Sequence, residues 1–174
     1  MYQLVKPSLA YVEQIAAYKE SFQQHNEKMH GSNFLSKADS IEQWIKDVDI
    51  FWDKATVPEG LAPCGTWILI RESDQQLLGI SNLRFELSTV FLQQYAGHIG
   101  YSIKPTERGQ GYGTKILELT LKEAQKKAIA EVLLICGDDN ISSAKVIEAN
   151  NGKLEKKVWD EVDQEWIRRY WIAL

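Results

Sequence analysis

The segment from Gly97 to Asn150 constrains the fold more than any other part of the chain, because strand and helix patterns alternate along it. A β-rich run over Gly97 to Lys104 leads through a glycine-rich turn into a predicted helix over about Tyr112 to Ile129. A predicted strand over Glu131 to Gly137, which contains the continuous apolar run V-L-L-I-C, and a second helix over about Ile141 to Asn150 follow. Because such an apolar run is typical of a strand covered on both faces, we expect a βαβα unit with helices on both sides of a sheet.

The first helix of this unit carries one apolar stripe. Leu117, Leu121, Ala124 and Ala128 recur at helical spacing, which predicts that they face the sheet. The lysines of the same helix fall mainly outside the stripe, so the opposite face is predicted to meet water.

Two further amphipathic helices are predicted near the N-terminus. A short apolar strand over residues 2–5 precedes the first helix, whose apolar residues recur at helical spacing between Leu9 and Phe22. Ser40 and Gln43 form the S-x-x-Q pattern of a capping box at the start of the second helix. The N-terminal part is therefore expected to be one strand followed by two helices.

Prolines, glycines and β-rich runs organise the remaining segments. The Pro- and Gly-containing segment Thr56 to Gly65 predicts a loop, and Leu87 to Tyr95 fits either a short helix or a loop. Four β-rich runs predict strands: Thr66 to Arg71, Leu77 to Phe85, Lys153 to Trp159 and Trp166 to Leu174.

Composition bounds the class of protein. With 174 residues, of which 44% are hydrophobic and 25% charged, the chain is expected to fold as one domain over residues 1–174. A net charge of -4 argues against a nucleic-acid partner, and no apolar run is long enough to span a membrane. The two cysteines lack metal-ligand spacing and no signal sequence is visible. We expect a cytoplasmic protein without a metal site, either a monomer or a homodimer.

The turn between the predicted strand and helix has the sequence Arg108-Gly109-Gln110-Gly111-Tyr112-Gly113. The first turn of a helix has backbone N–H groups without internal partners, and the helix dipole adds positive charge there. Glycines permit positive φ and leave room for an anion, so the turn is suited to a phosphate, although it would also serve as a tight turn without a ligand. Its spacing fits neither the G-x-x-x-x-G-K-[ST] loop nor the G-x-G-x-x-G dinucleotide fingerprint.

The order R-x-x-G-x-G resembles the [QR]-x-x-G-x-[GA] pyrophosphate loop of the GNAT superfamily of acetyl-CoA-dependent N-acetyltransferases. Gly97 to Gly113 (G-H-I-G-Y-S-I-K-P-T-E-R-G-Q-G-Y-G) resembles the fourth strand and loop of that family. Asp138 to Gly152 (D-D-N-I-S-S-A-K-V-I-E-A-N-N-G) resembles the segment after its fifth strand. These segments, with N-L-R-x-x-L at Asn82 to Leu87, are most similar to a bacterial branch of uncharacterised predicted acetyltransferases.

The resemblance implies a fold and a division of labour. The fold would be a single α/β (α+β) GNAT domain with a mixed, mostly antiparallel sheet of about seven strands, splayed at its middle, and helices on both faces. Acceptor-side helices would lie within about residues 8–53, and the acetyl-CoA-binding core within about residues 97–152.

The resemblance also implies which residues bind acetyl-CoA, with no metal. Main-chain groups of three strand residues would meet the pantetheine amides: Tyr101, Ser102 and Ile103. Main-chain N–H groups of the loop and one hydroxyl would hold the pyrophosphate: Arg108, Gly109, Gln110, Gly111, Tyr112, Gly113 and Thr114. The following loop and helix would add Asn140, Ser143 and Lys145.

Direct acetyl transfer needs a base for the amine and an acid for the departing thiolate. His98 is a candidate base because imidazole titrates near ~6.5, but strand alternation lets either His98 or Tyr101 face the cleft, and a buried, hydrogen-bonded histidine is the alternative. Glu86 is either a proton relay through water or an ordinary surface carboxylate. Many relatives have a tyrosine acid where this chain has Ile147, so Tyr101, Tyr112 or water would have to serve.

We therefore expect an acetyl-CoA-dependent N-acetyltransferase that moves an acetyl group directly to the amine of an unidentified small molecule or peptide. Two rival interpretations are an acyl-CoA-binding or sensory module without catalysis and a nucleotide-binding protein that uses the same loop. Acidic residues between Asp39 and Asp53 would favour a cationic amine, or would simply form the wet face of a helix.

Overall fold

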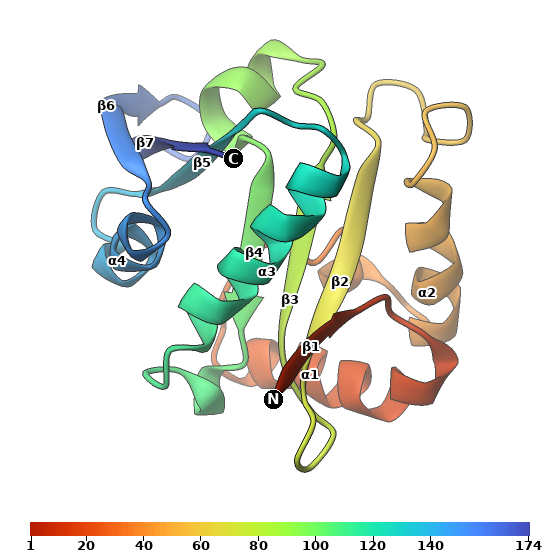
Figure 1. Cartoon of the computed structure of the whole chain (residues 1–174). Coiled ribbons are helices and arrows are strands. Elements are labelled where there is room, and N and C mark those ends of the chain that lie inside the picture. The colour runs from red at the N-terminus through yellow and green to blue at the C-terminus, as the bar shows by residue number, and fades with distance from the viewer.

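Two antiparallel sheets form the centre of the molecule (Figure 1). The computed structural model describes residues 1–174. The strands of the first sheet follow the order β1-β2-β3-β4, and those of the second follow the order β5-β7-β6. The main elements in chain order are β1 (Tyr2–Val5), α1 (Val12–Gln24), α2 (Ile41–Ile50), β2 (Cys64–Arg71), β3 (Gln76–Arg84), β4 (Ile99–Ile103), α3 (Tyr112–Lys126), β5 (Glu131–Gly137), α4 (Ile141–Ala149), β6 (Lys153–Asp160) and β7 (Glu165–Ala173).

The predicted order of strands and helices is confirmed, with one clear error at the end of α3. Leu117, Leu121 and Ala124 are buried as predicted. Ala128 is exposed and has a φ of 55°, because α3 ends at Lys126 and the chain turns there into β5. The apolar stripe therefore stops one turn earlier than the sequence pattern indicated.

Two local predictions are refined by the structure. The ambiguous segment before β4 forms one turn of π-helix over Leu92–Ala96. Ser40 caps α2 by accepting a hydrogen bond from the Gln43 backbone N–H at 3.1 Å. The Gln43 side chain does not return to Ser40 but donates to Asp47, its neighbour one helical turn on, so only half of the capping box forms.

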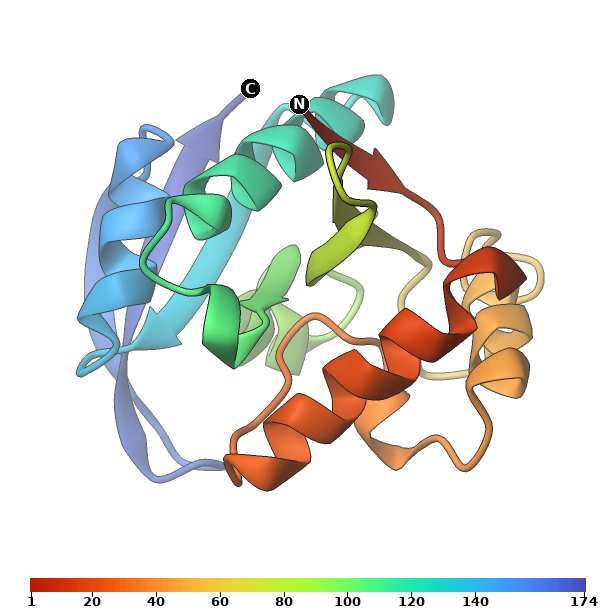
Figure 2. The ribbon, with the colours of Figure 1, turned by 90° about the horizontal axis from the view of Figure 1, so that it is seen from below.

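Helices cover both faces of the first sheet (Figures 1 and 2). Tyr18 of α1 and Trp44 of α2 pack with Ile68 on one face, whereas Leu117 of α3 packs with Trp67 on the other. Trp67 and Ile68 are consecutive in β2, so strand alternation delivers one side chain to each core. None of these helices has the length and apolar character that crossing a lipid bilayer requires.

The two sheets meet at one point, between the start of β4 and the middle of β5. The His98 backbone N–H donates to Leu133 O at 2.8 Å, and the Leu133 N–H donates to His98 Nδ1 at 2.9 Å. Gly97, with a φ of 69°, permits this approach, because a Cβ there would lie 2.4 Å from Leu133 O. No ladder joins the two strands. They therefore separate beyond this point, and the predicted splayed fold is confirmed.

Candidate functional site

A groove of about 600 Å³ lies between β4, the start of α3 and the start of α4. The sequence-predicted cofactor residues come together here, with the exception of Gln110: Tyr101, Ser102, Ile103, Arg108, Gly109, Gly111, Tyr112, Gly113, Thr114, Asn140, Ser143 and Lys145. The Gln110 side chain instead contacts Glu107 and the Tyr112 hydroxyl. Glu107, Ser142 and Val146 also line the groove, and the sequence analysis did not include them.

Glycine is favoured at the three glycine positions of the loop for different structural reasons. Gly109 and Gly111 have φ values of 78° and 82°, yet a Cβ at either position would meet no atom within 4 Å, so the backbone conformation rather than space favours glycine. Gly111 is the N-cap of α3, and no side chain caps this helix. Its first-turn N–H groups are therefore free to bind an anion in the groove. A Cβ at Gly113 would lie 3.0 Å from Val146, so this glycine allows α3 and α4 to pack closely.

Two polar side chains at the groove are held by protein partners. Asn140 caps α4, since its Oδ1 accepts the Ser143 N–H at 3.0 Å, which leaves its amide NH₂ for a ligand. The Arg108 guanidinium donates to Glu27, in the segment after α1, at 2.6 Å and to Ile103 O of β4 at 3.2 Å. The loop therefore presents main chain more than fixed charge to the groove.

The hydrogen-bond register of β4 decides which main-chain groups face the gap. The Lys104 N–H donates to Leu78 O at 2.9 Å, and hydrogen-bonded residues alternate along an antiparallel pair. The main-chain N–H and C=O groups of Ser102 therefore point toward β3, whereas those of Tyr101 and Ile103 point toward β5. The register therefore leaves outward main-chain groups of Tyr101 and Ile103 available for pairing in the gap, whereas those of Ser102 are used within the sheet.

A second cavity, of about 430 Å³, occupies the gap between β4 and β5. It shares Tyr101, Asn140 and Ser143 with the groove, so the two spaces are continuous. The exposed Lys28–Asp163 ion pair, at 3.3 Å, ties the β6–β7 turn to the segment after α1 beside this cavity (Figure 2). Four carboxylates line the cavity: Asp139, Asp160, Asp163 and Glu165.

A third cavity, of about 510 Å³, lies between the segment after α1, the loop before β2 and the segment before β4. It shares only His30, Gly31 and Arg84 with the second cavity, so these three residues form a neck between them. Gly31 has a φ of 70°, and a Cβ there would lie 2.2 Å from Gly100 O. The segment after α1 can lie directly on β4 only because residue 31 has no side chain.

Tyr101 lines both the groove and the second cavity. Its hydroxyl lies 3.0 Å from Ser143 Oγ, and burial raises its pKa to about 12. Ser143 is one helical turn before Ile147 on α4, so the Tyr101 hydroxyl reaches the helix face where many relatives of the resembled family carry a tyrosine. A neutral phenol is thus present at the junction of the two spaces.

His98 is placed where it joins the sheets. It is only 9% exposed and lines none of the three cavities. Its Nδ1 accepts the Leu133 N–H, so the neutral ring carries its proton on Nε2 and has no free lone pair. Burial, together with the nearby Arg84 charge, lowers its pKa to about 4. This geometry favours the buried, hydrogen-bonded histidine over the base, an alternative that the sequence left open.

His30 is the histidine that faces the cavities, and the sequence analysis missed it. Its ring lies in the neck, is open to solvent and has no hydrogen-bond partner in the protein. The walls of the cleft partly desolvate the ring and, with the nearby Lys28 charge, lower its pKa, so the ring is neutral near pH 7 with a free lone pair. Nothing in the sequence placed the segment after α1 against β4; the neighbouring Gly31 was the one available signal.

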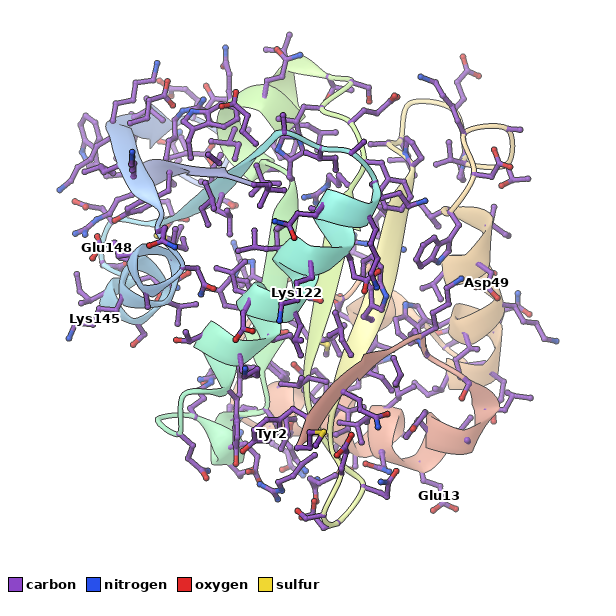
Figure 3. The ribbon with its side chains drawn as sticks, in the orientation of Figure 1. Tyr2, Glu13, Asp49, Lys122, Lys145 and Glu148 are labelled. Atoms are coloured by element: carbon purple, nitrogen blue, oxygen red, sulfur yellow. The ribbon has the colours of Figure 1, made fainter.

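The other side chains considered from the sequence lie elsewhere or are inert. Glu86 pairs with Lys54 at 2.9 Å and lines none of the cavities. Burial raises the pKa of Cys136 to about 11, which keeps it a thiol. Asp49 lies on α2, on the opposite flank of the molecule from Lys145 on α4 (Figure 3), and the acidic residues between Asp39 and Asp53 do not line the cavities. No group of three or more His, Cys, Asp or Glu side chains is arranged to hold a metal ion.

Comparison with known proteins places this geometry in a family. A family model described as an acetyltransferase (GNAT) domain matches residues 4–153. A search of curated proteins finds no significant match.

Solved structures share the fold along nearly the whole chain. The ribosomal L7/L12 alpha-N-protein acetyltransferase RimL, in complex with coenzyme A, superposes with a TM-score of 0.72 at 16% identity over 99% of this chain and 94% of that one. The microcin C7 self-immunity acetyltransferase MccE, in complex with acetyl-CoA and AMP, superposes with a TM-score of 0.72 at 14% identity. The match covers 99% of this chain and 92% of that one. The ribosomal-protein-S5-alanine acetyltransferase from Vibrio fischeri superposes with a TM-score of 0.72 at 16% identity. The match covers 99% of this chain and 92% of that one.

Proposed function

The chain belongs to the GNAT acetyltransferase family, and we propose that it transfers the acetyl group of acetyl-CoA directly to an amine. The proposal rests on one observation: the groove at the start of α3 continues into the second cavity, in the gap between β4 and β5, and from there through the neck into the third cavity. A donor bound on one side and an acceptor on the other would meet in that gap.

Acetyl-CoA supplies an acetyl group on a reactive thioester. The groove fits this molecule because an uncapped helix start offers N–H groups to the diphosphate, and the outward C=O of Tyr101 and N–H of Ile103 offer strand-like pairing to the pantetheine arm. The Asn140 amide and the Thr114 hydroxyl are further donors that line the groove. The Lys145 ammonium would favour the phosphates by charge.

The acceptor amine must lose a proton to attack. We assign this role to His30, directly or through one water, because it is the neutral imidazole with a free lone pair at the neck. The four carboxylates of the second cavity would attract the protonated amine before the proton is removed. His98 is assigned to holding the two sheets together, and Glu86 to an exposed ion pair.

The carbonyl oxygen gains negative charge during transfer. The main-chain N–H of Tyr101 points into the gap and is a suitable donor to that oxygen. The Tyr101 hydroxyl, beside Ser143 Oγ, would protonate the departing thiolate. It would serve as the acid because this chain has Ile147 at the position where many relatives have a tyrosine. Because burial raises the pKa of Tyr101 to about 12, this proton is held across the neutral range.

A turnover assay tests the proposal. The protein is incubated with acetyl-CoA and a panel of small amines and peptides, and released thiol and acetylated amine are both measured. Thiol release that depends on the amine supports the assignment. Firm acetyl-CoA binding without transfer to any amine would favour the binding or sensory module, and a larger thermal shift with ATP or NAD than with coenzyme A would favour a nucleotide-binding protein.

A further inference from the structure

Arg84 is the only arginine of the chain without a carboxylate partner. Each of the other four forms an ion pair: Arg71, Arg108, Arg168 and Arg169. Arg84 makes a single side-chain hydrogen bond, from Nη1 to Gly97 O at 3.1 Å. Burial lowers its pKa, and no carboxylate of the protein lies close enough to offset this effect. A guanidinium has five N–H donors in a planar fork, so most of its donors remain for a ligand.

Arg84 lines a space with a marked charge asymmetry. Arg84 lies in the neck, between the second and third cavities. The third cavity has Arg84 and Lys37 on its wall and no aspartate or glutamate, whereas four carboxylates line the second cavity. An anionic group is therefore favoured on the third-cavity side of the neck, and an amine on the other side.

The wall of the third cavity is otherwise rich in apolar side chains. Phe34, Leu61 and Phe91 line it and remain 52%, 41% and 49% exposed. Phe51 and Leu92 line it from more buried positions. Three exposed large hydrophobic residues around one cavity are a suitable surface for an apolar ligand group.

From these observations we infer that the acceptor is an apolar α-amino acid, an inference that rests on the proposed amine acetylation. Arg84 binds the α-carboxylate, the third cavity receives the side chain, and the α-amine lies at the neck beside His30. An α-amino acid fits because His30 and Arg84 are both neck residues, and its amine and carboxylate are separated by a single carbon. Bidentate pairing with a carboxylate is the geometry for which a guanidinium fork is suited.

A binding experiment tests the inference without requiring turnover. Affinities of N-acetyl-L-leucine and N-acetyl-L-phenylalanine, and of their primary amides, are measured by calorimetry in the presence of saturating coenzyme A. We expect each acid to bind about 10- to 100-fold more tightly than its amide. In Arg84→Gln this preference falls to less than about 3-fold, and in Arg84→Lys part of it returns, because a charge without the fork is restored.

Coenzyme A affinity and the unfolding temperature of Arg84→Gln verify that the variant remains folded. Lys37→Met is the matched control, since it removes the other cation of the cavity at a more exposed position and should retain most of the preference. Equal binding of acid and amide, no binding of either acid, or an unchanged preference in folded Arg84→Gln overturns the inference. An intact preference without acetylation of leucine or phenylalanine would count against the proposed transfer and leave the Arg84 assignment standing.

Discussion

The proposed cofactor groove and the proposed acceptor cavities meet at the gap between β4 and β5, but they are built from different parts of the chain. The groove is mostly main chain: an uncapped helix start, two glycines at positive φ and the outward edge of β4. The acceptor cavities are mostly side chains from loops, and their neck holds an imidazole and a guanidinium. On the proposed function, the groove would bind the cofactor mainly through the main chain, whereas side chains of the cavities would select the acceptor.

The sharpest test of this difference is the exchange of one histidine. His30→Ala should lower kcat about 100-fold and leave coenzyme A affinity nearly unchanged, because the base lies outside the groove. Since burial lowers the pKa of His30, wild-type kcat/KM should fall as the pH drops below that pKa, and the variant should lack this limb. Steady-state rates between pH 5 and 9 measure both. His25→Ala, whose ring contacts Ser21 O away from the cavities, is the control and should retain activity within about twofold.

His98 should affect stability rather than chemistry. Its pKa is about 4 in the folded protein and near 6.5 when unfolded, so the unfolded state binds the proton more readily between these values. The free energy of unfolding therefore keeps its full value above pH 6.5, where His98 is neutral in both states, and it decreases as the pH falls toward 4. The decrease amounts to about 2 kcal/mol between pH 7 and pH 5. His98→Asn keeps an acceptor for the Leu133 N–H but does not titrate.

Chemical denaturation at pH 7 and pH 5 measures this difference directly. The wild type should lose about 2 kcal/mol more than His98→Asn over this interval, while both turn over at similar rates at pH 7. Equal pH dependence of the two proteins, or a turnover loss as large as that of His30→Ala, would return His98 to the list of candidate bases.

Substitutions at two glycines with nearly the same backbone conformation allow the groove to be compared with the third cavity. Gly111 and Gly60 have φ values of 82° and 81°, and a Cβ at either would meet no atom within 4 Å. Gly111→Ala should weaken coenzyme A binding about tenfold, because the strained residue shifts the N–H groups at the start of α3. Gly60→Ala carries the same strain on the wall of the third cavity and should leave that affinity unchanged. Calorimetry with coenzyme A measures both affinities. Equal losses of affinity in the two variants would show that backbone strain alone, and not its position, is responsible.

Tyr101 contributes to both regions, through its main chain and through its hydroxyl. Tyr101→Phe should leave coenzyme A affinity intact and lower kcat about 5- to 10-fold, at the low end for an acid catalyst because a thiolate leaves easily. Burial raises the pKa of this phenol to about 12, so the wild-type kcat should show no decline up to pH 10. A fall in affinity without a fall in kcat would assign the hydroxyl to binding alone.

The smallest effect is expected at Glu86. Glu86→Gln should change kcat and kcat/KM by less than about twofold, because the carboxylate is 37% exposed, pairs with Lys54 and lines no cavity. Steady-state kinetics with the preferred amine measures this. A drop beyond tenfold would mean that the segment after β3 reaches the acceptor.

The same contrast explains what could be predicted from the sequence. The groove follows from local patterns: glycines between a strand and an amphipathic helix, and Asn140 at the start of the next helix. Gln110 is the one loop residue that does not line the groove, and its side chain makes local contacts with Glu107 and Tyr112. Ala128 was misplaced because helical spacing continues in the sequence after the helix has ended.

The acceptor side depends on contacts between residues far apart in the chain. His30 reaches the neck only because Gly31 packs on Gly100, and a distance of about 70 residues leaves no local signal. His98 and Leu133 are likewise brought together by the crossover through α3, so the occupied lone pair of His98 was invisible in the strand pattern. The unpaired charge of Arg84 is a property of the folded surroundings, because pairing of an arginine cannot be read from its neighbours in sequence.

A crystal structure with bound coenzyme A tests the central claim most directly. The account predicts that the diphosphate accepts hydrogen bonds from N–H groups around Gly111 at the start of α3, and that the pantetheine amides pair with the main chain of Tyr101 and Ile103, so that the thiol ends in the gap beside Ser143. A coenzyme that binds outside the groove, or a gap closed by continuous pairing of β4 with β5, would contradict it.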